Sequence, residues 1–168
     1  MDALTRLIAI EDIKQLKARY FRCMDMKNWD EFRTLFDKNV IIDCTEAFTP
    51  LDYAGKPIEP GLEIVEPDKA LYVVGIDAFM VEQLKNLTNV STVHHGHMPE
   101  IELLSETTAR GTWSMEDKLR WPSNAKSDMR LMHGYGHYRE TYEKQARGWV
   151  IKTLKLTRVR IDSVKKGA

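Results

Sequence analysis

The chain has 168 residues, with 25 basic and 25 acidic side chains, so its formal net charge at pH 7 is zero. A chain of this length is most simply one domain that buries a core and a small cavity. The balanced charge argues against a nucleic-acid partner, and no apolar run is long enough to cross a membrane. We therefore expect the partner to be a small molecule or a second copy of the chain.

The cysteines and the first residues bear on the compartment. Cys23 and Cys44 lie in neither a metal-binding nor a redox spacing. The first residues do not have the cationic and apolar pattern of a secretion leader. We therefore expect a cytoplasmic protein with reduced thiols.

Two helices and a strand are predicted in the first 44 residues. Apolar side chains recur at helical spacing from residue 4 to 22, at Leu4, Leu7, Ile8, Ile13, Leu16 and Tyr20. Asn28 then stands at the cap position of a second, short helix, with Glu31 at the capping-box position. The β-branched run from 40 to 44 predicts a strand.

Residues 45 to 75 are predicted to form a long loop or lid insertion, because prolines and glycines are scattered through them. A loop of this length in a compact domain is usually functional or mobile. Phe48 and Tyr53 are candidates to reach from it into a pocket. Asp77 is then the expected cap of a third helix, from 77 to about 87.

From residue 90 onward the pattern predicts long strands, at 91 to 97, 99 to 105, 107 to 119, 129 to 143 and 148 to 161. Long strands joined by short polar turns predict an antiparallel, strongly curved sheet. Helices first and strands last is an α+β arrangement. We therefore predict a single α+β domain that spans residues 1 to 168.

Two strands carry charged residues on a face that is otherwise apolar. The face of the strand 107 to 119 that should be buried carries Trp113, Met115, Asp117 and Leu119. A buried carboxylate must find a partner or take up a proton, so Asp117 is either paired with an arginine or active toward a substrate. In the last strand, Arg158 and Arg160 continue an apolar face if the alternation is unbroken. Either arginine could pair with Asp117, bind a ligand, or extend to solvent.

Three histidines stand within four positions, at His94, His95 and His97. On a strand, His94 faces one way while His95 and His97 face the other. Three such side chains could not all reach one ion, and neither cysteine is spaced to help, so no metal site is predicted.

A sheet-facing histidine could instead meet a carboxylate from the first helix. Asp25 follows the end of that helix, and Tyr20 lies on its apolar face, where pattern alone favours a core residue. A cavity between helix and sheet would bring such groups together as an Asp–His dyad, the usual way to orient an imidazole as a general base. His133 and His137 share a face of a later strand and could line the same cavity or lie on the surface.

Three stretches resemble the SnoaL-like branch of the nuclear transport factor 2-like superfamily, and within it the bile acid 7α-dehydratases. They read KARYFRCMDMKNWDEF, HHGHMPEIELLSETTARGTWSMEDKL and GHYRETYEKQARGWVIKTLKLTRVRI, and the resemblance covers nearly all of the chain except residues 45 to 75. It implies a cone-shaped α+β fold, in which a strongly curved, mostly antiparallel sheet wraps over N-terminal helices. It also implies a homo-oligomer, a dimer or trimer, formed through the outer face of the sheet.

The resemblance further implies a catalytic set and a reaction. The implied catalytic residues are Tyr20, Asp25, His94, Asp117 and Arg160, with Arg158 as the alternative arginine. The implied activity is a cofactor-independent and metal-free dehydration of a hydrophobic, steroid-like or polycyclic carbonyl compound. Because this fold hosts many activities, an isomerase or cyclase with the same dyad, a dioxygenase β subunit, or a non-catalytic small-molecule-binding protein remain alternatives.

Overall fold

The computed structural model describes residues 1–50, 52, 54, 56 and 71–167. These residues form an α+β domain, which confirms the predicted fold class. The elements are α1 (Ala3–Met26), α2 (Trp29–Thr34), β1 (Phe36–Glu46), β2 (Tyr72–Val74), α3 (Ile76–Leu87), β3 (Ser91–Leu103), β4 (Thr108–Arg120), β5 (Met129–Gln145) and β6 (Gly148–Lys165).

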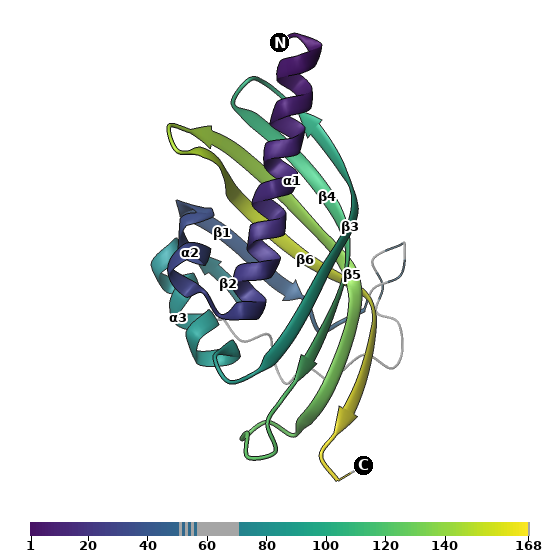
Figure 1. The fold of residues 1–168 in the computed structure, drawn as a ribbon. Coiled ribbons are helices and arrows are strands. Elements are labelled where there is room, and N and C mark those ends of the chain that lie inside the picture. The colour runs from purple at the N-terminus through teal and green to yellow at the C-terminus, as the bar shows by residue number, and fades with distance from the viewer. Residues whose placement is uncertain (51, 53, 55, 57–70, 168) are drawn as a thin grey trace.

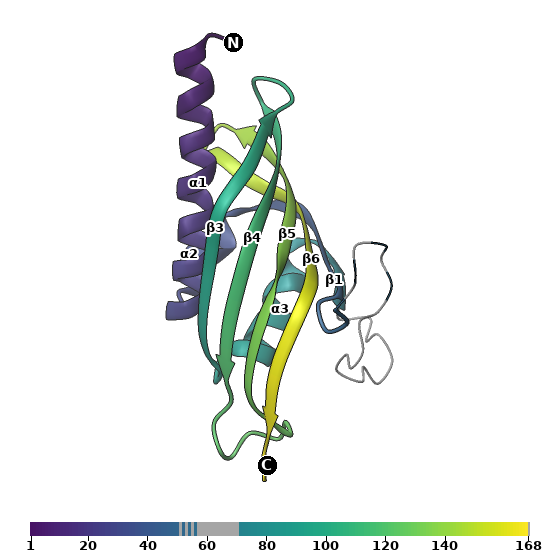
Figure 2. The same ribbon diagram turned by 90° about the vertical axis from the view of Figure 1, so that its right-hand side faces the viewer.

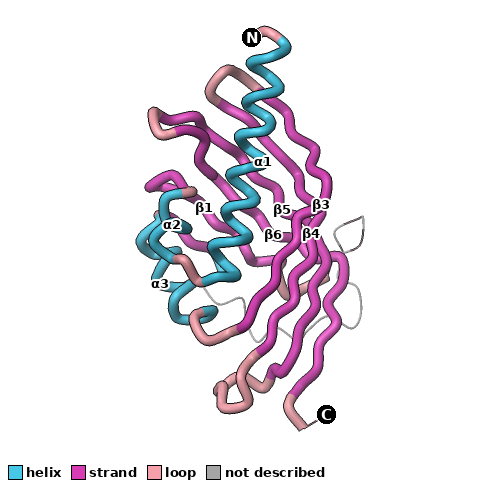
Figure 3. Tube along the Cα trace, viewed as in Figure 1, coloured by secondary structure: helices cyan, strands magenta, loops and turns pink. Residues whose placement is uncertain are grey.

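The strands of the described residues form a six-stranded sheet in the order β2-β1-β6-β5-β4-β3. All neighbouring pairs are antiparallel except β1 and β6, so the predicted mostly antiparallel sheet is confirmed. Figures 1 and 2 show the sheet curving around the helices, with α1 across one face and α2 and α3 beside β1 and β2. Figure 3 shows how far β5 and β6 extend along the molecule. This curvature places the concave face of the sheet opposite the helices.

Helix α1 buries one stripe against the sheet, as its periodicity predicts. Ile13, Leu16 and Tyr20 are at most 3% exposed. By contrast, Leu4 and Leu7, which the pattern placed on the same buried face, are 66% and 65% exposed. The reason is that the first turns of α1 project beyond the sheet (Figure 1), so the apolar side chains of these turns have no strand to pack against.

The predicted cap of α2 is confirmed, whereas that of α3 is corrected. The Asn28 side chain accepts a hydrogen bond from the Glu31 backbone N–H at 3.4 Å, and its amide donates to the Glu31 carboxylate at 2.9 Å. Helix α3 begins at Ile76 after Gly75, which has a φ of 91° and provides no side-chain cap. Asp77 lies in the first turn and pairs with Arg33 instead of capping.

The predicted strands 91 to 97 and 99 to 105 are one strand, β3, with a register shift between Gly96 and Pro99. A side chain at Gly96 would place its Cβ 2.5 Å from the Phe21 ring, so this glycine lets α1 approach β3 closely. Strand β2 lies within the predicted loop or lid over residues 45 to 75. The greater part of that loop, with Tyr53, lies outside the described residues, so its function as a lid stays a prediction. Across the part of the chain that is described, no helix has the length and apolarity needed to span a membrane.

Candidate active site

A cavity of about 540 Å³ lies between the helices and the curved sheet. Its volume is within the range of about 300–1,000 Å³ that is usual for small-molecule sites. Most of the wall is apolar, and it includes Met24, Ile42, Phe48, Leu71, Val73, Phe79, Leu119, Met132, Leu154 and Leu156. A few polar side chains interrupt this wall, namely Tyr20, His94, Asp117, Tyr138 and Arg158 deep in the fold and Glu82, Gln83, Asn86 and Ser127 from α3 and the β4–β5 connection. Such a cavity suits a hydrophobic molecule that carries a few polar groups.

His94 and Asp25 form the dyad that the sequence suggested. The Nδ1 atom of His94 lies 2.6 Å from Asp25 Oδ1, and the His94 backbone N–H donates to Asp25 Oδ2 at 2.9 Å. The Thr92 hydroxyl donates to Asp25 Oδ1, also at 2.9 Å. An ionised carboxylate only accepts hydrogen bonds, so the proton of a neutral His94 lies on Nδ1. This leaves Nε2 as the basic nitrogen, on a residue that lines the cavity.

The same contacts keep Asp25 ionised. Partial burial raises the pKa of this carboxyl, but hydrogen bonds from the His94 side chain and backbone and from Thr92 outweigh that effect. The pKa of Asp25 therefore lies below its usual value. A carboxylate held in this way fixes the orientation of the imidazole and stabilises its protonated form.

Two tyrosines share the cavity wall near the dyad. Tyr20 and Tyr138 are each 3% exposed, and their ring centroids are 5.9 Å apart. Burial, with a further contribution from Tyr138 and Glu140, raises the pKa of Tyr20 well above its usual value. Burial, followed by the nearby charge of Asp117, likewise raises the pKa of Tyr138. Both phenols are therefore protonated near neutral pH, so each has an O–H group that can donate one hydrogen bond.

Asp117 is buried and pairs with Arg158 in a two-point contact. Arg158 Nη1 donates to Asp117 Oδ1 at 3.0 Å, and Nη2 donates to Oδ2 at 2.6 Å. Arg158 Nε donates to the Ala47 carbonyl at 3.1 Å, which fixes the guanidinium plane. The interpretation of Asp117 as the partner of an arginine is confirmed, and its side chain also lines the cavity, so its activity toward a substrate stays a prediction. Asp117 is also the direct cross-strand neighbour of His94, so the ion pair lies beside the dyad.

Arg160, which we expected in the site, lies outside it, and Arg158 is the arginine of the cavity. The reason is a break in the alternation of β6: Gly136 of β5 pairs with Arg158, but the next residue, Tyr135, pairs with Arg160. Val159 is therefore an extra residue, a β-bulge, and it turns Arg160 to the other face. There the Arg160 side chain is 68% exposed and pairs with Asp162.

Gly134 makes room for the buried ion pair. A Cβ at this position would lie 2.4 Å from Arg158 Nη1 and 2.6 Å from Asp117 Oδ1. We expect Gly134→Ala to displace the pair and to lower the free energy of unfolding by about 1–3 kcal/mol, measured by urea denaturation. Ser114→Ala, at an exposed position of the neighbouring strand, is the control and should have little effect. Unchanged stability of Gly134→Ala would mean that the ion pair is not held in this position.

A buried ion pair that the sequence analysis did not identify lies behind the tyrosines. Lys17 and Glu140 are in direct contact, and both side chains are fully buried. The Lys17 ammonium lies 3.9 Å from the ring centroid of Tyr20 and 3.7 Å from that of Tyr138. The helical spacing could have revealed Lys17, since it is four residues after Ile13 and three before Tyr20 on the buried stripe. Tyr138 could have been found from the alternation of β5, where every second residue from Met132 to Tyr142 is buried.

The remaining histidines do not line the cavity. His133 Nε2 lies 2.6 Å from Glu116 Oε2, and His95 Nδ1 lies 3.5 Å from Glu116 Oε1. His97 is exposed, and His137 is not among the described cavity residues. Within the described ranges, no three His, Cys, Asp or Glu side chains are arranged to hold a metal ion.

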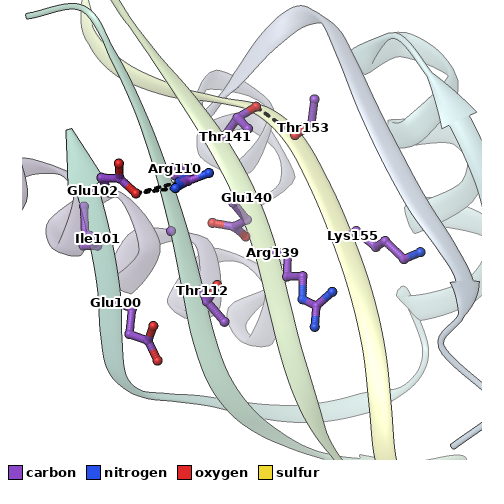
Figure 4. A pocket seen from close by; sticks show the side chains of 11 residues that line it. Glu100, Ile101, Glu102, Arg110, Thr112, Arg139, Glu140, Thr141, Thr153 and Lys155 are labelled. Carbon is purple, nitrogen blue, oxygen red and sulfur yellow. Dashed lines mark hydrogen bonds and ion pairs between the residues drawn. The ribbon is translucent and has the colours of Figure 1, made fainter. Parts of the chain in front are cut away.

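A second hollow, of about 710 Å³, lies on the face of the sheet shown in Figure 4. Charged and hydroxyl side chains dominate its lining, as Figure 4 shows for Glu100, Glu102, Arg110, Thr112, Arg139, Thr141, Thr153 and Lys155. Glu102 pairs with Arg110 there, and Thr141 with Thr153. This hollow is larger than the apolar cavity, but it contains neither the dyad nor a substantial apolar wall. The chemistry points to the cavity as the site.

The fold and the cavity define a class of protein: cone-shaped α+β domains in which a curved sheet and helices enclose an apolar site with a few polar groups. A family model described as the SnoaL-like domain matches residues 5–155. The chain therefore belongs to the SnoaL-like family, as the sequence motifs indicated. A closer kinship with the bile acid 7α-dehydratases stays a prediction.

Several solved structures share this fold. A protein assigned as a scytalone dehydratase from Novosphingobium aromaticivorans DSM 12444 is 20% identical, with a TM-score of 0.73 over 99% of this chain and 95% of that chain. Hexachlorocyclohexane dehydrochlorinase LinA-type3 from Novosphingobium barchaimii LL02 is 12% identical, with a TM-score of 0.68 over 99% and 97%. A protein assigned as an aromatic ring hydroxylase from Novosphingobium aromaticivorans is 13% identical, with a TM-score of 0.70 over 94% of each chain. At these identities the likeness establishes the fold, and the named activities are those of the other proteins.

Proposed function

We propose that the protein is a cofactor-independent lyase that eliminates water from a hydrophobic carbonyl compound. The observation that carries this proposal is the His94–Asp25 pair, with its 2.6 Å contact, on the wall of an apolar cavity. A neutral imidazole is a suitable base near neutral pH, and the carboxylate fixes its tautomer. Tyr20 and the Asp117–Arg158 pair supply polar groups for the two oxygens of a hydroxylated carbonyl substrate.

In the proposed first step, His94 Nε2 removes a proton from a carbon that the substrate carbonyl acidifies. The electron pair of the broken C–H bond moves into an enolate or dienolate, so negative charge develops on the carbonyl oxygen. Tyr20 then donates a hydrogen bond to that oxygen. Its phenol is protonated and buried, and a fixed donor in a dry site stabilises a developing oxyanion strongly.

In the second step, the enolate electrons return to form the new C=C bond, and the C–O bond to the hydroxyl breaks. The departing hydroxide takes up the proton that His94 removed, so one water leaves and the imidazole is neutral again. Arg158 is suited to donate a hydrogen bond to the leaving oxygen, while Asp117 holds the guanidinium in place.

The wall of the cavity supports a hydrophobic substrate. A volume of about 540 Å³ between mostly apolar side chains fits a steroid-like or polycyclic molecule. The names of two proteins with this fold, a dehydratase and a dehydrochlorinase, both denote elimination reactions, which supports a lyase. Together with the sequence motifs, this favours a dehydratase of the bile acid 7α-dehydratase type.

The test is a mass-spectrometric assay of the wild-type protein on hydroxylated 3-oxo-4-ene steroids and their thioesters. We expect a product that has lost one water. A product of unchanged mass with a shifted double bond or a new ring would instead indicate an isomerase or cyclase. Substrates that bind but return unchanged would overturn the enzymatic proposal in favour of a binding protein.

A further inference from the structure

Lys27 has an unusual backbone conformation at the point where α1 ends. Its φ of 58° and ψ of 29° are left-handed, and among the described residues it is the one non-glycine residue with a positive φ. Asn28 N–H donates to the Cys23 carbonyl across this turn, a helix ending in which glycine usually occupies the left-handed position. Glycine or asparagine is the usual residue in this conformation, so the contacts of the Lys27 side chain are of interest.

The Lys27 side chain turns back toward the dyad. Its ammonium donates to Thr92 Oγ1 at 2.9 Å, and the Thr92 hydroxyl is 2.9 Å from Asp25 Oδ1. Thr92 is 4% exposed, so the middle of this connection is buried, whereas Lys27 and Asp25 at its two ends are half-buried. The described contacts thus form a chain that leads from Lys27 through Thr92 and Asp25 to His94.

The donor and acceptor groups fix the direction of each hydrogen bond in this series. An ammonium can only donate, so the Thr92 oxygen accepts from Lys27 and its own proton goes to Asp25. Asp25 Oδ1 then receives hydrogen bonds from Thr92 and from His94 Nδ1, while Oδ2 receives the His94 backbone N–H. If Thr92 did not donate, the carboxylate would be freer to rotate away from the imidazole.

Lys27 also contributes a positive charge near the dyad. Asp25 on α1 and Lys27 after it are connected to His94 through hydrogen bonds, and Asp117 on β4 and Arg158 on β6 form their own ion pair beside the dyad. Glu82 of α3 lines the same cavity, and Lys17 and Glu140 neutralise each other behind the tyrosines. The ammonium attracts the Asp25 carboxylate, which helps to keep that carboxylate in place beside the imidazole.

We infer that Lys27 and Thr92 are positioning residues of the active site, which hold Asp25 and thereby select the Nδ1-protonated tautomer of His94. This inference rests on the proposed function of His94 as a base. The two residues touch the dyad and not the substrate. It explains why a lysine is placed in a conformation that suits glycine.

The experiment is an NMR titration of the histidine side chains in the ligand-free protein, which reports tautomer and protonation without turnover. In Lys27→Met, Asp25 loses one of its supports, so the share of the Nδ1-protonated tautomer of His94 should fall. In Thr92→Val, the share of the Nδ1-protonated tautomer should fall. Lys27→Arg and Thr92→Ser keep the charge and the hydroxyl, so they should restore the wild-type signals.

Two further variants separate this function from a structural one. Lys27→Gly relieves the backbone conformation, so it should fold at least as well as wild type while changing the His94 tautomer as Lys27→Met does. Lys14→Met removes an exposed lysine of α1 and should leave His94 unchanged. If the NMR signals of the His94 side chain were the same as in wild type in both Lys27→Met and Lys27→Gly, the inference would be overturned.

The steroid assay distinguishes the two proposals. If wild type converts a substrate but the His94 NMR signals do not change in the Lys27 variants, only the positioning inference is overturned. If those signals change but wild type converts none of the substrates, the positioning of the dyad stands and the proposed dehydration is overturned.

Discussion

Replacing His94 by alanine is expected to lower kcat for the elimination by about 10³-fold, with much less effect on KM. The variant loses the base that removes the substrate proton, a contribution of about 10²–10⁴-fold in general base catalysis. Tyr20, Asp117 and Arg158 would remain to bind the carbonyl and hydroxyl groups. Loss of an interaction that acts mainly in the transition state lowers kcat and changes KM little.

His95→Ala is the matched control for that measurement. His95 is the next residue of β3, but its side chain is 52% exposed and lies near Glu116 on the other side of the sheet. We expect wild-type kcat and KM for this variant, and similar thermal unfolding for both variants. Turnover by His94→Ala close to the wild-type rate, with the fold intact, would exclude His94 as the base.

The parts of the site that could be predicted from the sequence are those set by a regular period. Strict alternation along β4 placed Asp117 on the buried face, and helical spacing placed Tyr20 on the buried stripe of α1. The meeting of Asp25 with His94 required one further step, that the end of α1 lies against β3. The structure brings these two side chains together at hydrogen-bond distance.

The predictions were wrong where the alternation of a strand is interrupted, or where a helix is longer than the sheet that it packs against. The extra residue Val159 in β6 puts Arg158 and Arg160 on opposite faces, and nothing in the local sequence marks that bulge. Leu4 follows the helical pattern but is exposed, because it lies beyond the edge of the sheet. The spacing of residues within one helix does not indicate where the neighbouring sheet ends. The left-handed conformation of Lys27 is hidden for a similar reason, since glycine or asparagine is the usual signal there.

Removing one partner of the buried Lys17–Glu140 pair is expected to destabilise the fold by about 3–5 kcal/mol. Both side chains are fully buried, and Glu140 also accepts a hydrogen bond from the Tyr142 hydroxyl at 2.5 Å. Trp113 Nε1 in turn donates to Tyr142 at 2.8 Å, so the carboxylate belongs to a connected buried network. In Lys17→Met, that carboxylate would remain in the core without its counter-ion. Urea unfolding monitored by circular dichroism measures the loss.

The double variant Lys17→Met, Glu140→Leu should recover a large part of this stability, because it removes both buried charges. Arg110→Met is the control, since it breaks an exposed pair with Glu102 and should change stability little. If the two single variants were as stable as wild type, the pair would not be a buried ion pair in solution. A double variant that is stable but has a lower kcat would show what the charges contribute beyond stability, since Lys17 lies against the rings of Tyr20 and Tyr138 in the cavity wall. The ammonium would then act through those phenols, as a cation that strengthens the donor opposite the developing oxyanion.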